Sequence, residues 1–152
     1  MTVRATRWHA LAGALALAGV GDTAYLMVLS GAAQAGEQCP AGGCGGVLGS
    51  AYAHTFGVSN SVWGLLAYAL AMALVGVAVA RVPGPRRAAT ALLMAVNCLG
   101  VAAHAYFVYL KAAVLREFCP FCLTSAGLMV FLAAAATVLG YQELTVAERD
   151  RG

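Results

Sequence analysis

Long runs of apolar residues alternate with short polar segments along this chain. Each of four runs is long enough for the roughly 20 residues that an α-helix needs to cross a bilayer. They lie at 8–30, 61–80, 88–110 and 119–141. Apolar residues make up 62% of the 152 residues and charged residues only 10%, whereas a soluble domain carries about 25% charged residues. The pattern predicts an all-α membrane protein, a single bundle of four transmembrane helices that takes up residues 1–152.

The basic residues are distributed unequally between the polar segments. Seven of the nine lie before the first run, between the second and third runs, or after the fourth: Arg4, Arg7, Arg81, Arg86, Arg87, Arg149 and Arg151. The other two, Lys111 and Arg116, lie between the third and fourth runs. The positive-inside rule therefore places both termini in the cytoplasm, and the net charge of +3 needs no nucleic acid to explain it. Residues 31–60 and the start of the fourth run then face outward, where disulfide chemistry is allowed.

The first run also has features of a cleaved signal peptide. Arg4 and Arg7 precede it, and Ala33-Gln34-Ala35 has the small residues of a cleavage site. However, the run is too long for a signal peptide, and Asp22 interrupts it. We expect a retained membrane span.

The fourth run begins with Cys119-Pro120-Phe121-Cys122. Two cysteines three positions apart on a helix share one face and can form a disulfide. The positive end of a helix dipole stabilises a thiolate, and Pro120 suits a first helical turn. The motif favours redox chemistry at the outer face, with metal binding and an inert pair as the alternatives.

A second cysteine pair, Cys39 and Cys44, lies in the Gly-rich outer segment 31–60. It either forms a structural disulfide that stabilises the loop or is a mobile dithiol that exchanges with the membrane pair. Four cysteines permit three pairings, and the sequence leaves the pairing open. Residues 47–56 predict a short interfacial helix over the mouth of the bundle, and residues 59–61 predict the N-cap of the second span.

Three further polar residues lie within the apolar runs. Asp22 is costly if it faces lipid, so it is either a proton or polar partner or a hydrogen-bonding group inside the bundle. His104 is either a proton donor or a histidine satisfied within the bundle, and the second interpretation is favoured. Cys98 is expected to be a small packing residue.

These features together resemble the vitamin K epoxide reductase family in its bacterial, single-module form. The resemblance extends over nearly the whole chain. It is carried by Tyr25, Cys39 and Cys44, Ser50 six residues after Cys44, Asn60-Ser61-x-x-Gly64 with Tyr68 one turn on, and Tyr106 thirteen residues before Cys119-Pro120-Phe121-Cys122. The order and spacing of these residues are specific together, although no single one is decisive.

The resemblance implies a four-helix bundle around a quinone pocket, capped by the outer loop. It implies that a thioredoxin-fold, DsbA-like partner reduces Cys39 and Cys44, that Cys44 exchanges with Cys119, and that Cys122 reduces the quinone, either menaquinone or ubiquinone. Asn60 is then expected to bind a quinone carbonyl and Ser50 to hold the loop. The pocket residues expected beside them are Val47, Leu48, Trp63, Tyr68 and Ala126.

Two departures from the animal members of this family concern the substrate. Animal members carry a tyrosine where this chain has Ala126, and a longer gap between the loop cysteines than Cys39–Cys44. Both favour a bacterial enzyme that reduces a quinone rather than an epoxide. The chain ends soon after the fourth run, so we expect a separate partner protein and no fused thioredoxin domain.

The primary hypothesis is an inner-membrane thiol–disulfide oxidoreductase that supports disulfide formation and needs no metal. The first alternative is a reductase that uses partner thiols to reduce a quinone or quinone epoxide. Its relevant product is then the reduced quinone and not the oxidised partner. The second binds or transports a thiophilic metal ion through the two cysteine pairs.

Overall fold

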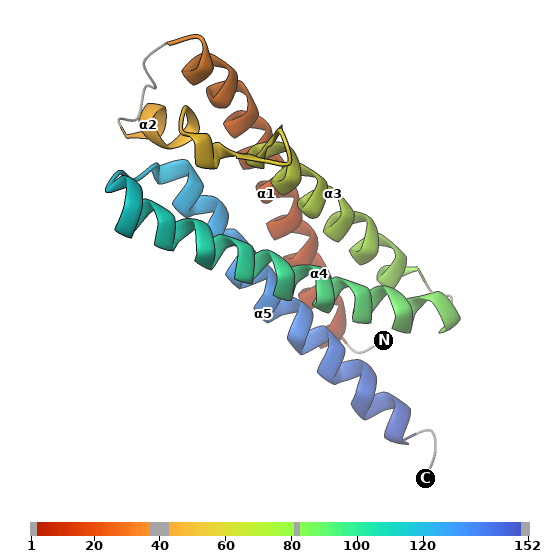
Figure 1. Ribbon diagram of the computed structural model, residues 1–152. Coiled ribbons are helices and arrows are strands. Elements are labelled where there is room, and N and C mark those ends of the chain that lie inside the picture. The colour runs from red at the N-terminus through yellow and green to blue at the C-terminus, as the bar shows by residue number, and fades with distance from the viewer. Residues whose placement is uncertain (1–2, 37–42, 81–82, 150–152) are drawn as a thin grey trace.

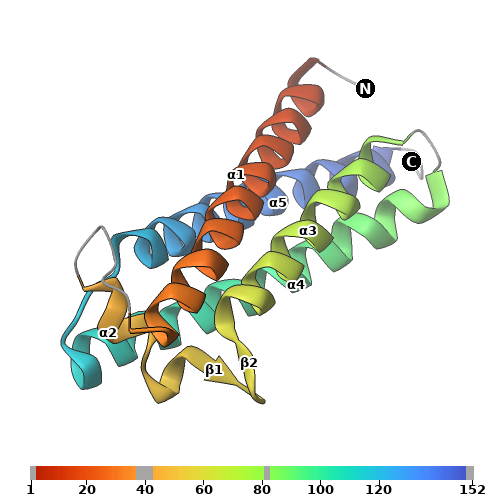
Figure 2. The same cartoon turned by 90° about the horizontal axis from the view of Figure 1, so that it is seen from above.

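Four long helices form the body of the molecule in the computed structural model, which describes residues 3–36, 43–80 and 83–149. They are α1 (Val3–Gln34), α3 (Asn60–Val79), α4 (Pro83–Leu110) and α5 (Pro120–Arg149). Helix α1 packs on α3 and α5, and α4 packs on the same two helices, so α1 and α4 occupy opposite corners. Figures 1 and 2 show this arrangement from two sides. All four helices contain stretches long and apolar enough to cross a membrane, which confirms the predicted all-α membrane bundle.

The outer segment folds into a cap over one end of the bundle. It contains α2 (Cys44–Leu48), the 3₁₀ turn η1 (Ala51–Ala53) and the strands β1 (His54–Thr55) and β2 (Val58–Ser59). In Figure 1 the cap lies beside the C-terminal half of α1 and the start of α5. The opposite end of the bundle holds the first turn of α1, the end of α3 and the end of α5. The cap therefore lies at the end where α5 begins with the Cys-x-x-Cys motif.

The single interfacial helix expected at 47–56 is wrong in extent. The helical turn begins earlier, at Cys44, and the chain from His54 onward forms an antiparallel hairpin. The two turn residues, Phe56 and Gly57, have φ angles of 55° and 77°. Positive φ at both central residues is the geometry of a tight two-residue hairpin turn. The alternation of small and apolar residues did not reveal this turn, because only Gly57 is a typical turn residue.

The N-cap expected before α3 is confirmed. Ser59 precedes the helix in an extended conformation, and its side chain accepts a hydrogen bond from the Ser61 backbone N–H at 3.4 Å. The Ser59 hydroxyl also lies 3.2 Å from the hydroxyl of Ser30 on α1. The start of α3 is thus tied to α1 as well as to the cap.

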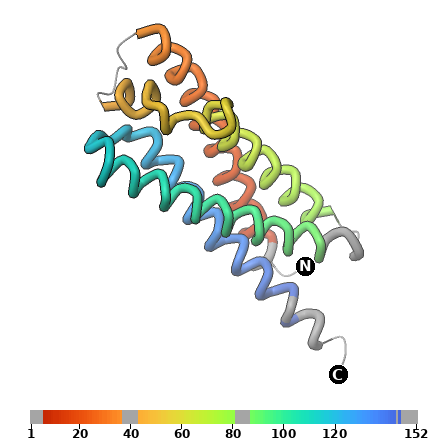
Figure 3. Tube along the Cα trace, in the orientation of Figure 1, coloured from red at the N-terminus to blue at the C-terminus, as the bar shows by residue number. Residues whose placement is uncertain are grey.

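Helix α4 continues past its end as a wider π-helical turn, η2 (Lys111–Leu115). Arg116 then takes a left-handed conformation with φ 53°, and a short extended stretch leads to Cys119. The trace in Figure 3 shows the chain reversing here, so that α5 runs back along α4. The short link predicts such an antiparallel pair.

Small side chains let the helices approach closely in the centre of the bundle. Ala12, Ala16, Ala71, Ala135 and Ala136 are all buried there. In a membrane, helix association depends on this kind of close packing, because lipid is as apolar as the core. The buried ring of Tyr68 needs more room than its small neighbours, and it lies against the backbone of Gly19.

Replacing Gly19 with alanine is expected to destabilise the bundle by about 1–3 kcal/mol, as overpacking of a filled core usually does. The added methyl would overlap the Tyr68 ring, whose Cγ is 2.6 Å from the position that the new carbon takes. Thermal unfolding in detergent measures the change. Gly21→Ala, on the same helix with no atom within 4 Å of the added carbon, is the matched control. Equal melting temperatures for the two variants would contradict the close packing.

Candidate functional site

The cap brings one loop cysteine against the membrane motif. Cys44 opens α2, Cys119 directly precedes α5, and their Sγ atoms lie 2.6 Å apart. Both residues are fully buried, within a cluster of apolar side chains from α1 and α2: Leu26, Leu29, Val47 and Leu48. This packing holds two cysteines that are 75 residues apart in the sequence at a distance suited to thiol–disulfide exchange.

Cys119 is placed to react as a thiolate. Hydrogen bonding with Cys122 lowers the pKa of Cys119 against the opposing effect of burial. Contact with Cys44 and the positive charge of Lys111 lower this pKa further, to about 6. An ordinary cysteine has a pKa of about 8.5. The Cys119 thiolate therefore predominates at neutral pH and is lost only as the pH falls below about 6.

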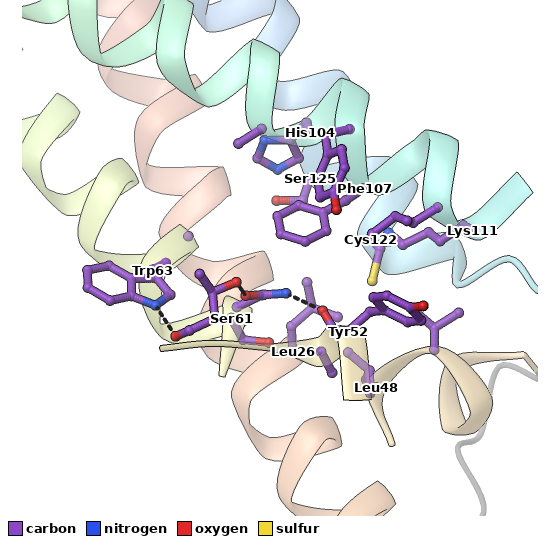
Figure 4. Close-up of a pocket in the computed structure, with 18 of the residues that line it drawn as sticks. Leu26, Leu48, Tyr52, Ser61, Trp63, His104, Phe107, Lys111, Cys122 and Ser125 are labelled. Atoms are coloured by element: carbon purple, nitrogen blue, oxygen red, sulfur yellow. Dashed lines mark hydrogen bonds between the residues drawn. The ribbon is translucent and has the colours of Figure 1, made fainter. Parts of the chain in front are cut away.

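The second cysteine of the motif faces a cavity of about 460 Å³ beneath the cap. Figure 4 shows the Cys122 sulfur directed into this space, between Lys111 and the ring of Tyr52. The walls come from α1, the cap, α3, α4 and α5 and are mostly apolar. The residues that line the cavity include Val47, Leu48, Ser50, Tyr52, Thr55, Asn60, Trp63, Gly100, His104, Phe107, Lys111, Cys122 and Ser125.

Hydrogen bonds from the start of α3 hold the cap over this cavity. The Asn60 amide donates to the Tyr52 carbonyl at 2.8 Å, and its oxygen accepts from the Thr55 hydroxyl at 2.7 Å. The Trp63 indole donates to the Thr55 carbonyl at 3.2 Å. Figure 4 shows part of this network along the floor of the cavity. An amide has two N–H donors, so one donor of Asn60 remains after the bond to Tyr52.

Five of the seven residues expected in the pocket line the cavity: Asn60, Ser50, Val47, Leu48 and Trp63. The Ser50 hydroxyl donates to the Val47 carbonyl at 2.8 Å, which closes the turn after α2. Whether these residues bind a quinone stays a prediction.

Tyr68 and Ala126 do not belong to the cavity wall as the structure has it. Tyr68 is fully buried deeper in the bundle, where its hydroxyl donates to the Ser125 carbonyl at 2.6 Å. Ala126 is half-buried on α5, beside the lining residue Ser125. The family resemblance placed Tyr68 on the second span and Ala126 on the fourth but could not fix which way each side chain points. Cys39 lies outside the described residues.

The other polar residues singled out in the sequence have distinct surroundings. The Asp22 side chain hydrogen-bonds to Ser125, while its Oδ2 atom is buried without a partner. His104 Nδ1 lies 2.8 Å from the Gly100 carbonyl, and the ring borders the cavity. Cys98 is exposed on α4, so its expected role in packing is wrong. Within residues 3–36, 43–80 and 83–149, no three His, Cys, Asp or Glu side chains gather in a way that could hold a metal ion.

Lys111 was not among the site residues expected from the sequence, where it counted only as an outer charge. The structure buries it to 8% exposure in the cavity wall. A signal was present in its spacing, since Gly100, His104, Phe107 and Lys111 follow one another at intervals of three or four and so share a helix face. The same face carries His104 and Lys111, the two basic side chains that α4 and η2 contribute to the described cavity wall.

Comparison with protein families gives a match that agrees with this geometry. Residues 10–137 match the family described as the Vitamin K epoxide reductase family. The matched stretch covers most of the chain and includes parts of all four long helices, the cap and both cysteine motifs.

Proposed function

The chain belongs to the vitamin K epoxide reductase family of membrane thiol oxidoreductases that work with a quinone, and we propose that it oxidises a separate thioredoxin-fold partner at the expense of a membrane quinone. Electrons then pass from Cys39 and Cys44 to Cys119 and Cys122. The product is an oxidised partner that can introduce disulfides into secreted proteins. The observation that carries this proposal is the 2.6 Å contact between the sulfurs of Cys44 and Cys119.

The exchange steps balance as two-electron transfers between dithiols and disulfides. Two partner thiols become a disulfide as the bond between Cys39 and Cys44 is reduced. The Cys44 thiolate then attacks Cys119, which breaks the bond between Cys119 and Cys122. Cys39 next attacks Cys44 and releases Cys119, so the loop disulfide is restored and the membrane pair is reduced. When Cys119 and Cys122 close their disulfide again, two electrons and two protons leave them.

The residues of the cavity fit a quinone as the oxidising substrate. A largely apolar space of this size is typical of small-molecule sites. When bound, a quinone accepts the two electrons and two protons. Asn60 retains one N–H donor for a carbonyl oxygen, and Cys122 supplies the reducing sulfur at the cavity wall. The quinone is menaquinone or ubiquinone in this proposal, and no metal takes part.

The proposal also includes an orientation in the cell membrane. Both termini and the link between α3 and α4 face the cytoplasm, and the cap faces outward. The distribution of basic residues supports this orientation. The cap that carries the loop pair then faces the oxidising compartment in which a periplasmic, DsbA-like partner works.

Purified protein is expected to reduce a quinone continuously when a reduced thioredoxin-fold thiol protein is supplied. The loss of quinone absorbance and the appearance of partner disulfide should match one to one. Cys98→Ala serves as a control, because Cys98 is exposed on α4 and absent from the cavity wall. Failure of the wild type with menaquinone and ubiquinone analogues and an active partner would contradict the proposal. Thiol-dependent turnover of a quinone epoxide in that case would assign the family's reductase activity instead.

A further inference from the structure

Lys111 brings a positive charge into the wall of a mostly apolar cavity. It is the first residue of the π-helical turn η2 and is 8% exposed. Figure 4 shows its side chain beside Cys122, at the same end of the cavity. Single π-turns within helices are rare and often occur at functional sites.

The Lys111 ammonium interacts with both sulfurs of the membrane motif. It hydrogen-bonds to Cys122 and interacts electrostatically with Cys119 and with His104. Burying an ammonium in apolar surroundings is costly unless a group of opposite charge or a hydrogen-bond acceptor faces it. A cysteine thiolate supplies both.

Other ionisable groups around the dithiol come from each neighbouring element. His104 borders the cavity from α4, Asp22 on α1 hydrogen-bonds to Ser125 and is affected by the charge of Cys119, and Cys44 contacts Cys119 from α2. Glu117, in the link before α5, is exposed and lies against Gly46 of the cap. Among these groups, Lys111 is the buried cation that hydrogen-bonds to Cys122 and interacts electrostatically with Cys119.

We propose that Lys111 is a positioning residue whose ammonium stabilises the single thiolate carried by the reduced Cys119–Cys122 pair. One thiol proton leaves to solvent, the negative charge is shared by hydrogen bonding between the two sulfurs, and no electron moves in this step. The thiolate is thereby available at neutral pH for exchange on the cap side and for electron transfer on the cavity side. The use of the thiolate rests on the proposed function, but its stabilisation does not.

The alternative is a structural role, in which the aliphatic stem of Lys111 fills space and its charge merely reaches toward the interface. Lys111→Met keeps most of this stem and removes the charge, whereas Lys111→Arg keeps the charge. Arg116→Gln is the matched control, because Arg116 is an exposed cation only five residues further along the same link. Exposed charges at such a site are screened by solvent and salt.

The test is a pH titration of thiolate ultraviolet absorbance in the full chain, reduced with dithiothreitol and held in detergent. Cys39, Cys44 and Cys98 are replaced by serine, so that only the motif pair contributes. An opposite charge in contact shifts a cysteine pKa by about one unit or more. Lys111→Met is therefore expected to move the first deprotonation upward by about one pH unit, with about tenfold less thiolate at any pH below both midpoints. Lys111→Arg should restore the midpoint, and Arg116→Gln should leave it unchanged.

Either an unchanged midpoint in a folded Lys111→Met variant or an equal shift in Arg116→Gln would overturn the proposal. Lys111→Gln, which retains a polar end, replaces Lys111→Met if the latter does not fold. The titration needs neither quinone nor partner. A protein that shows the Lys111 effect but no quinone turnover would therefore contradict only the proposed function.

Discussion

Replacing Cys122 with alanine is expected to lower quinone reduction to the rate without protein. Cys122 is the sulfur that faces the cavity, while Cys119 is fully buried against Cys44. Alanine leaves no thiol in the cavity wall and no second sulfur with which Cys119 can form a disulfide. The loss should therefore affect the maximal rate and not only the apparent affinity for quinone.

The same variant is expected to retain exchange between the loop and Cys119. The contact of Cys44 with Cys119 does not involve the Cys122 side chain, and alanine occupies less space than cysteine. The Cys119 thiolate should then attack the Cys39–Cys44 disulfide and release the Cys39 thiol, and the resulting Cys44–Cys119 bridge should accumulate relative to wild type because Cys122 is no longer present to attack Cys119 and break it. Peptide mapping without reductant detects this bridge, and Cys98→Ala controls for loss of an unrelated cysteine. Quinone turnover at the wild-type rate in Cys122→Ala would contradict the electron route.

The membrane bundle could be predicted because its determinants are local in the sequence. Each long helix follows from an uninterrupted apolar run, and the Ser59 cap follows from residue type next to such a run. The cap was less predictable. Its hairpin depends on Phe56 adopting a positive φ, which is unusual for an aromatic residue and leaves no signature in composition.

The cysteine pairs could be predicted from the sequence itself, whereas a pocket was expected only through the family resemblance. Spacing alone identified the Cys-x-x-Cys pair, while the contact between Cys44 and Cys119 depends on how the cap folds over α5. Tyr68 was expected in the pocket but donates its hydroxyl to α5. Lys111 was counted only as an outer charge, because its helical register was not considered. Both residues show that the direction of a side chain is decided by packing between helices.

Replacing Gly43 with alanine is expected to slow exchange between the loop and Cys119 by about 100-fold, the cost that a displacement of about 1 Å can impose at a reacting centre. Gly43 directly precedes Cys44 and has φ 66°. A left-handed conformation costs a residue with a side chain about 1–2 kcal/mol. The added carbon would also overlap the Phe118 carbonyl oxygen and lie 3.3 Å from its carbon. The clashing atoms belong to the backbone of Phe118, which immediately precedes Cys119. The clash is therefore expected to push the two reacting cysteines apart.

The next glycine along the chain, Gly45, separates this effect from a general disturbance of the cap. Gly45 lies within α2, and an added carbon there meets no atom within 4 Å. Gly45→Ala is therefore expected to leave the rate unchanged and to stabilise the helix by about 0.4–1 kcal/mol. The exchange rates of the two variants are compared by stopped flow. Each reaction is started by mixing protein that has a reduced motif with a disulfide-bonded partner. Similar rates for Gly43→Ala and Gly45→Ala would show that the close approach at Phe118 does not hold Cys44 against Cys119. A loss confined to Gly43→Ala would instead locate the geometric requirement for electron transfer in one backbone contact between the cap and the start of α5.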